Sequence, residues 1–229
     1  MRQLVNLLKW DVLLLNRNNF FMLGAIVAAI YIGVFYLIKP IGNLTILLVV
    51  LIFNDPIVTG YLFAAILLLF DKNQNTLQAI SVLPLTINKY LLSKAIILSV
   101  LATVTSFIMA YATKGIYFNH IHLLFATFFS AFIFSCFGFA ISAVSKTFNQ
   151  LLFYSIPFFI ISAVPFLSIF EYGEIEYFLL FPSAGGIGII KASFDEVAFT
   201  RAVFLYVHLL CWSIISWWIA VKTVKQQLS

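Results

Sequence analysis

The chain has 229 residues, of which 63% are hydrophobic and 9% are charged. Soluble domains carry about 25% charged residues, so this composition excludes a water-soluble fold and indicates an integral membrane protein. The formal net charge is +5, but the Lys and Arg residues lie at the ends of apolar blocks and form no basic cluster, which argues against a nucleic-acid partner. The 26 Phe residues and the lack of alternating ten-residue segments favour spanning helices over a β-barrel.

Residues 1–19 predict an amphipathic helix that lies in the membrane interface. Its apolar positions share one helical face and are Leu4, Leu7, Leu8, Val12 and Leu15. Cations and Asp11 interrupt the sequence elsewhere, as expected for a helix with one side in the acyl boundary and its cations toward the headgroups. The next apolar block runs for 19 residues, longer than the core of a signal peptide, so we expect a membrane span there.

Six apolar blocks are long enough to cross a bilayer as helices. They are residues 20–38, 44–70, 95–112 with a polar lead-in, 121–144, 151–170 and 202–221. At about 1.5 Å per residue the second block would be roughly 40 Å long, so it must tilt, kink or emerge from the membrane. We expect Asn54-Asp55-Pro56 to break it. The fold class predicted is an all-α integral membrane protein, with a single domain over residues 1–229.

The distribution of cations predicts the orientation of the chain. An even number of spans places both termini on one side of the membrane. If that side is the cytosol, nine Lys and Arg residues fall in inner segments and four in outer segments. The positive-inside rule therefore predicts a multi-pass protein of the plasma or inner membrane with both termini cytosolic, and it places the loop 71–94 in the cytosol.

The loop 71–94 is too polar to span and is patterned like a short helix between two spans. Asn73, Asn75 or Thr76 would cap a short helix whose apolar residues fall three apart on one stripe, at Leu77, Ile80 and Leu83. Pro84 ends it, because the residue before a proline is pushed out of the helical region. Thr86 can cap the helix that follows. The pattern predicts a short amphipathic helix across the gap between two spans; a merely solvated loop is the alternative.

The segment 171–200 is too polar to span and too apolar for a free loop. Residues 178–181, the breaks at Pro182 and Gly185-Gly186, and the apolar run 187–190 suggest a helix, a break and a second short helix. Non-helical backbone at membrane depth must be sheltered by protein or water. We expect a re-entrant or lid-like hairpin that dips into the outer leaflet or caps the bundle.

The sequence carries no signature of catalysis or of a bound metal. It has no G-x-x-x-x-G-K-[ST] motif, which would form a phosphate-binding loop for ATP. Any energy that the protein needs would therefore come from another subunit or from an ion gradient. Ser183-Ala184-Gly185-Gly186 is not a nucleophile elbow, and no Ser/His/Asp constellation is apparent. The histidines are too few for a metal site, so we expect packed or interfacial roles for His120, His122 and His208. The two cysteines, Cys136 and Cys211, are expected to be buried core thiols.

Asp55 is the acidic residue of greatest interest, because an acid at membrane depth is costly and points to a functional site. Together with Pro56 it is a candidate for the polar wall of a conduit or for a gate at a kink. Alternatively, the second span begins later and leaves Asp55 near the outer headgroups. Tyr61 follows at a spacing that does not place it on the Asp55 face of a helix.

A set of residues around the cytosolic loop carries a family resemblance. They are Asp71-Lys72, Thr76-Leu77-Gln78-Ala79, Val82, Pro84-Leu85, Tyr90-Leu91 and Ser93-Lys94, preceded in the second span by Asp55-Pro56 with Gly60 and Phe63. In these residues the chain resembles the permease subunits of ABC-2 type exporters, and among them it is most similar to the compact six-span permeases grouped with fluoroquinolone exporters. Asp71 stands where a Glu is more usual, and Asn75 where a Gly commonly precedes the Thr.

The resemblance implies that residues 71–86 form a coupling helix that docks on a separate ATP-hydrolysing subunit. Two permeases, as a homodimer or paired with a related permease, would join two ATPases. The chain itself would bind no cofactor, because ATP and Mg would be held by the partner subunit. The ATPase contact would comprise Asp71, Lys72, Thr76, Leu77, Ala79, Ile80, Val82, Pro84 and Leu85.

The function expected is that of a non-catalytic permease subunit that exports a hydrophobic or amphipathic cargo, such as a drug, a peptide or a lipid-like molecule. Two alternatives belong to other classes. One is a secondary transporter or channel that uses Asp55, and the other is a membrane assembly factor with no transported substrate.

Overall fold

The computed structural model describes residues 2–38, 44–74, 76, 86–170 and 172–227, and every regular element in them is helical. Six of these helices are long and apolar enough to cross a membrane, which confirms the predicted fold class. They span Phe20–Ile38, Thr45–Asn73, Ile87–Lys114, His120–Val144, Phe148–Ser168 and Phe199–Gln226. The fifth of these combines α8 (Phe148–Ala163) with the short 3₁₀ helix η2 (Val164–Ser168).

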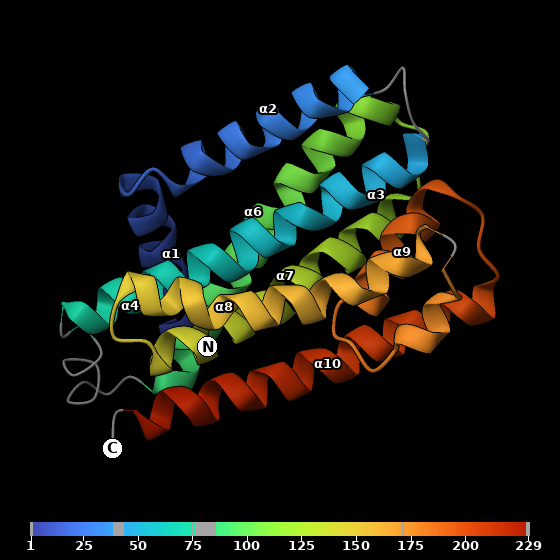
Figure 1. The fold of residues 1–229 in the computed structure, drawn as a ribbon. Helices are drawn as coiled ribbons and strands as arrows, with labels where there is room; N and C mark the ends of the chain where they lie inside the picture. The colour runs from blue at the N-terminus through green and yellow to red at the C-terminus, as the bar shows by residue number, and fades with distance from the viewer. Residues whose placement is uncertain (1, 39–43, 75, 77–85, 171, 228–229) are drawn as a thin grey trace.

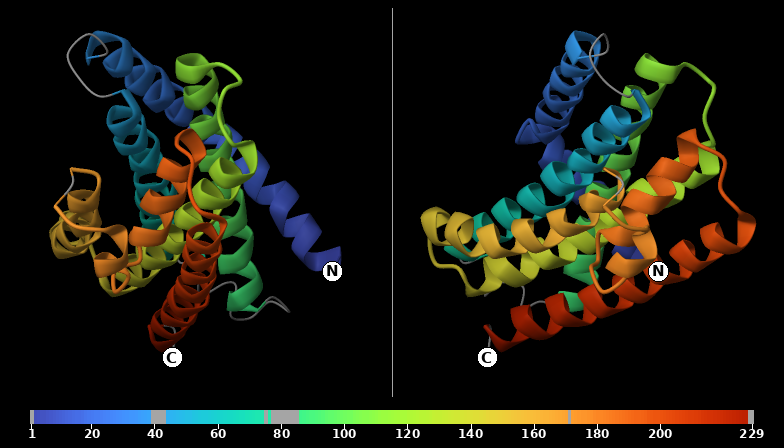
Figure 2. Two further views of the ribbon diagram at one scale, coloured as in Figure 1. Left: turned by 90° about the vertical axis from the view of Figure 1, so that its right-hand side faces the viewer. Right: turned by 45° about the vertical axis from the view of Figure 1, so that its right-hand side comes forward.

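The bundle is organised around α7 (His120–Val144), which packs against α6 (Ile87–Lys114), α10 (Phe199–Gln226), the short helix α9 (Ala184–Phe194) and the second span. In contrast, α2 (Phe20–Ile38), α8 and α10 leave most of their side chains exposed. Figures 1 and 2 show α2 and α10 on opposite sides of the bundle. These exposed faces are apolar, as expected for surfaces that meet lipid or another membrane protein.

The second span is a single helical rod in three parts, namely α3 (Leu44–Asp55), a π-helical stretch η1 (Pro56–Leu62) and α4 (Phe63–Asn73). The expectation that Asn54-Asp55-Pro56 breaks it is therefore wrong, because the chain stays helical and widens instead. Pro56 donates no backbone hydrogen bond and its ring crowds the preceding turn, which an α-helix cannot absorb. Thr59 Oγ1 donates to the Asp55 carbonyl at 2.7 Å and so satisfies an acceptor in this irregular turn.

The second span crosses α7 at two glycines. A Cβ placed on Gly138 would lie 2.5 Å from the Tyr61 carbonyl oxygen, and one on Gly60 would lie 2.8 Å from the Ala131 carbonyl oxygen. Both neighbours are backbone atoms, which cannot move aside as a flexible side chain can. Small residues at such crossings let helices approach closely in membranes, where packing takes the place of the hydrophobic effect.

Gly138→Ala is therefore expected to destabilise the bundle, by about 1–3 kcal/mol for an overpacked core position. The measurement is the thermal unfolding midpoint of the purified protein in a neutral detergent. Gly33→Ala is the matched control, because a Cβ at Gly33 has no atom within 4 Å. Equal midpoints for the two variants would show that the α7 crossing tolerates the extra methyl group.

One end of the bundle gathers α1 (Arg2–Arg17), the end of α4, the beginning of α6 and the end of α10 in a shared apolar cluster. Leu15, Leu67, Leu91 and Val224 are among its buried members. Both chain ends thus lie at the end of the bundle from which the 71–94 loop emerges (Figure 1). Between α1 and α2, Asn19 adopts a positive φ of 59°, a conformation that Asn tolerates better than most residues.

At the opposite end, the segment predicted to form a hairpin holds a 3₁₀ turn, η3 (Ile175–Phe178), followed by α9. Most of α9 is buried, and it packs against α3, α7 and α10. The C-terminal end of α9 lies at the beginning of α7, since Asn119 N donates to the Ser193 carbonyl at 2.8 Å.

Candidate functional site

The predicted ATPase contact lies only partly in the described residues. Asp71 and Lys72 end the second span, and Thr76 is described, whereas six members of the set lie outside the described part of the chain. Those six are Leu77, Ala79, Ile80, Val82, Pro84 and Leu85. What the structure does describe is the base of the loop, where α4 ends and α6 begins.

An ion cluster made of Asp11, Asp71 and Lys94 lies at the base of the loop. Lys94, on α6, is 4% exposed, and its Nζ lies 3.3 Å from Asp11 Oδ1 and 3.3 Å from Asp71 Oδ2. Asp11 comes from α1 and Asp71 from α4, so one cation joins three helices. We call this set the basal ion cluster.

Two hydroxyl groups of α6 complete the basal ion cluster. Tyr90 donates its phenolic hydrogen to Asp71 Oδ2, and Ser93 Oγ donates to Asp11 Oδ2 at 2.5 Å. The Lys94 ammonium also lies 4.9 Å from the centre of the Tyr90 ring. Each carboxylate therefore receives both a hydroxyl and the ammonium, which offsets the cost of burying two acids beside a single base.

Helical spacing explains why α6 supplies three of these groups. Tyr90, Ser93 and Lys94 lie three and four residues apart, so they project from one face of α6. Asp11 lies seven residues after Leu4 and four before Leu15, on the apolar stripe of α1, and it is 9% exposed. The expectation that Asp11 lies away from the apolar face is therefore wrong. One feature of the sequence could have indicated a special role for Asp11, namely that it is the one acid in residues 1–19.

Lys72 fastens the same end of α4 to α7. Its Nζ donates to the Ala143 carbonyl at 2.5 Å and to the Ser145 carbonyl at 3.1 Å. These carbonyls belong to the C-terminal turn of α7, where a cation is favoured by the helix dipole and by unpaired acceptors. The loop is thus held on both sides, because α4 is bound to α6 through the basal ion cluster and to α7 through Lys72.

Thr86 occupies the predicted cap position of α6. Its backbone is extended, and its carbonyl accepts from Lys89 N at 2.9 Å and from Tyr90 N at 3.2 Å. Its side chain makes no capping hydrogen bond. The position of the helix start was thus predicted, while the side-chain bond was not found.

Asp55 lies inside the bundle and faces α6. Its side chain is fully buried, and Oδ2 accepts hydrogen bonds from Thr105 and, at 3.2 Å, from Ser106 Oγ. At about 1.5 Å per residue, Asp55 lies roughly 17 Å along the helix from Leu44, near the middle of a span. Asp55 Oδ1 has no hydrogen-bond partner among the described residues. Sequence reasoning did not find Thr105 and Ser106, which are 50 and 51 residues away.

Tyr61 does not share the face of Asp55, as its spacing predicted, and it contacts α8 instead. Its hydroxyl shares a hydrogen bond of 2.6 Å with Ser155 Oγ of α8, and its ring stacks on Phe158 with centroids 5.0 Å apart. The second span therefore contacts α6 through Asp55, directly before the π-helical stretch, and α8 through Tyr61, within that stretch.

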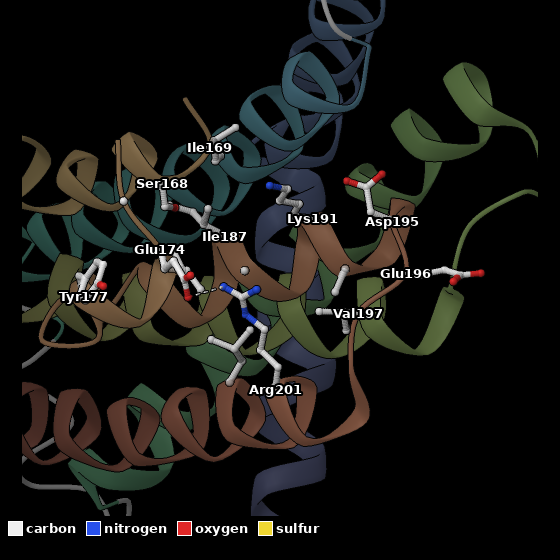
Figure 3. Close-up of a pocket in the computed structure, with 15 residues that line it drawn as sticks. Ser168, Ile169, Glu174, Tyr177, Ile187, Lys191, Asp195, Glu196, Val197 and Arg201 are labelled. Carbon is white, nitrogen blue, oxygen red and sulfur yellow. Dashed lines mark ion pairs between the residues drawn. The ribbon is translucent and has the colours of Figure 1, made fainter. Parts of the chain in front are cut away.

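A cavity of about 520 Å³ opens at the other end of the bundle, between the 3₁₀ turns, α9 and the beginning of α10 (Figure 3). Arg201 Nε lies 2.5 Å from Glu176 Oε1, and Arg201 Nη2 donates to Glu176 Oε2 at 2.7 Å. This bidentate pair ties α10 to the η3 turn. Lys191 of α9 lines the other side of the cavity.

The predictions for histidine and cysteine are confirmed with one exception. His122 bonds the Tyr206 hydroxyl, His120 stacks on Phe118, and His208 Nε2 lies 2.8 Å from the Leu179 carbonyl oxygen. Cys136 is buried, but Cys211 is exposed on α10, so its prediction as a core thiol is wrong. Composition could not show whether Cys211 lies on the inward or the outward face of a largely apolar helix. No group of His, Cys, Asp or Glu suited to a metal occurs among the described residues.

Six spanning-length helices with a buried acid in the second span define a multi-pass membrane protein. The chain matches the model of the fluoroquinolones export permease protein family over residues 2–228, and it belongs to that family. A comparison with curated proteins finds no match.

Proposed function

We propose that this permease is the membrane-spanning subunit of an ATP-driven exporter, and that a separate ATPase subunit docks on residues 71–86 from the cytosol. The single observation that carries the proposal is the basal ion cluster, which holds the two stems of that loop to α1 and to each other. A push on the loop would therefore move packed helices as a unit rather than bend a free segment. ATP and Mg belong to the partner subunit in this arrangement.

The assembly we infer contains two permeases and two ATPases, with both permease termini in the cytosol. Support for a second membrane subunit comes from the apolar side chains that α2, α8 and α10 leave exposed. The cargo class is hydrophobic or amphipathic, and the family description, which refers to fluoroquinolones, is compatible with a drug of that kind. The π-helical stretch that begins at Pro56, next to Asp55, is the proposed gate, because such turns interrupt a helix at functional sites.

The docking proposal predicts that Leu77→Asp or Ile80→Asp abolishes co-purification of the ATPase subunit with the permease. A buried charge without a partner in the centre of an interface costs several kcal/mol, which is about a thousandfold or more in affinity. The measurement is the amount of ATPase retained on affinity-tagged permease. Ile116→Asp is the control, because it adds the same charge in the exposed turn at the opposite end of the bundle.

If both loop variants retained as much ATPase as the wild type, the ATPase would not dock on residues 71–86. A cysteine placed at Gln78 tests the orientation separately, since it should react with a thiol reagent only from the cytosolic side. Labelling of that cysteine from outside intact cells would contradict the proposed function as a whole.

A second candidate function is a secondary transporter or channel, and the fully buried Asp55 at mid-span is the observation that favours it. Transport that survives depletion of ATP and is lost in Asp55→Asn would support this alternative. An assembly factor, the third candidate, would show no substrate-stimulated ATP hydrolysis in a reconstituted complex.

A further inference from the structure

The N-terminus of α9 is an uncapped helix end inside the protein. Ser183 holds the cap position, but its φ of −78° and ψ of −21° are helical, and its side chain makes no capping bond. A capping serine needs an extended backbone to reach the N–H groups of the first turn. The described bonds of this turn are Ala184 N to Phe181 O at 3.2 Å and Ile187 N to Ser183 O at 3.0 Å. The N–H groups of Gly185 and Gly186 have no acceptor among the described residues.

Three buried polar atoms without a described partner surround this same turn, and they come from three helices. They are Ser183 Oγ at the start of α9, Ser130 Oγ of α7 and His208 Nδ1 of α10. A Cβ placed on Gly186 would lie 2.2 Å from Ser130 Oγ, and one on Gly185 would lie 2.5 Å from His208 Nδ1. The two glycines therefore allow a hydroxyl and an imidazole to lie against the helix end.

The helix end lies deep in the bundle. Ser130 is about 15 Å along α7 from His120, and His208 is roughly 14 Å along α10 from Phe199, at about 1.5 Å per residue. The other end of α9 meets the beginning of α7 through the bond between Asn119 and Ser193. The N-terminus of α9 therefore points toward mid-span, where each unpaired polar group costs several kcal/mol. A short helix whose N-terminus, the positive end of the helix dipole, lies at that depth can stabilise a negative charge.

The chemistry of the surrounding groups favours an anion as the ligand. Two backbone N–H groups and two serine hydroxyls can all donate, and the helix dipole adds positive potential. The His208 Nε2 faces a carbonyl oxygen and so carries the hydrogen of the neutral ring, which leaves donation to an anion to the backbone and serine groups. We propose that the first turn of α9, with Ser130 and Ser183, binds a small monovalent anion such as chloride.

Binding there would join α7, α9 and α10 around one ion and would hold the outer segment in place. This inference does not depend on the ATPase subunit, so the purified permease alone is sufficient to test it. The probe is chloride, titrated against gluconate at constant ionic strength, with the thermal unfolding midpoint in a neutral detergent as the readout. The wild-type midpoint is expected to rise with chloride and to saturate.

Ser130→Ala is expected to raise the half-saturating chloride concentration by about tenfold or more, because it removes a hydrogen bond to a charged group. Ser162→Ala is the matched control. Ser162 is 1% exposed on α8, and its Oγ also lacks a described partner. Its removal should leave the chloride response unchanged. An equal response in wild type and Ser130→Ala would overturn the proposal.

Ser183→Asp provides a second test, because a carboxylate at the cap position would supply the anion covalently. This variant is expected to have a midpoint that no longer depends on chloride. A chloride response of wild-type size in Ser183→Asp would contradict the site. If the site holds only a water molecule, the wild type will not respond to chloride and bromide-soaked crystals will show no anomalous peak beside Gly185 and Gly186. Either result would overturn the proposal.

Discussion

Lys94→Met is expected to destabilise the permease by about 3–5 kcal/mol, the usual cost of removing one partner from a buried ion pair. The variant would leave Asp11 and Asp71 facing each other in a buried site without their shared cation. Thermal unfolding in a neutral detergent measures the change. Lys89→Met is the control on the same helix, since the Lys89 ammonium group donates only to the Gln3 side chain at the exposed surface among the described residues.

The basal ion cluster has a second, charge-balanced test. Lys94→Met combined with Asp11→Asn and Asp71→Asn removes all three charges, so most of the lost stability should return. The triple variant should still hydrolyse ATP with its partner subunit, but it should export less cargo for each ATP, because the loop stems are no longer joined by the ion cluster. If the triple variant exported as much cargo for each ATP as the wild type, the cluster would stabilise the bundle without transmitting force. A Lys94→Met protein as stable as Lys89→Met would contradict the structural role itself.

Asp55→Ala is expected to lower the unfolding free energy by about 1–3 kcal/mol, because Thr105 and Ser106 would lose a hydrogen-bond acceptor in the buried interface between α3 and α6. Asp55→Asn keeps an acceptor oxygen and nearly the same volume, so its stability should stay much closer to wild type. The comparison of the two unfolding midpoints separates the effect of the acceptor oxygen from that of the ionisable carboxyl group.

Transport by Asp55→Asn then tests the gate. Under our proposal the variant folds and stimulates its ATPase partner, but it exports poorly, because the buried ionisable carboxyl group beside the π-helical stretch is lost. Export at the wild-type rate would reduce Asp55 to a structural link between α3 and α6. The measurement is cargo export by the reconstituted complex, with Asn54→Ala as the control, since Asn54 bonds only the Val50 carbonyl of its own helix among the described residues.

Much of the fold was predictable from local pattern. The six spans follow from uninterrupted apolar blocks, since a bilayer demands about 20 apolar residues per helix wherever the helix packs. The start of α6 after Pro84 was also predictable, because proline and the capping position act on neighbouring residues alone. The pattern around Asp55-Pro56 located an irregularity in the second span, but it did not distinguish a break from a π-helical stretch. That outcome depended on the packing of α6 and α7 on either side.

The side-chain partners were not predictable, because they join positions that are far apart in the chain. Lys94 meets Asp11 across 83 residues, and Thr105 meets Asp55 across 50 residues. The local sequence places Asp11 on the apolar stripe of α1, but nothing in it identifies Lys94 as the partner of Asp11. The same limit applies to Cys211, whose immediate neighbours in α10 are apolar.

The sequence by itself determined that the protein is an all-helical membrane protein with six spans and a polar loop after the second, because hydropathy, helix propensity and turn chemistry are properties of contiguous residues. Only the tertiary structure decided that this loop is held by the basal ion cluster, that Asp55 faces α6, and that the N-terminus of α9 points into the bundle beside Ser130 and His208. Those features depend on the rotation and depth of each helix relative to its neighbours, which packing between distant segments sets.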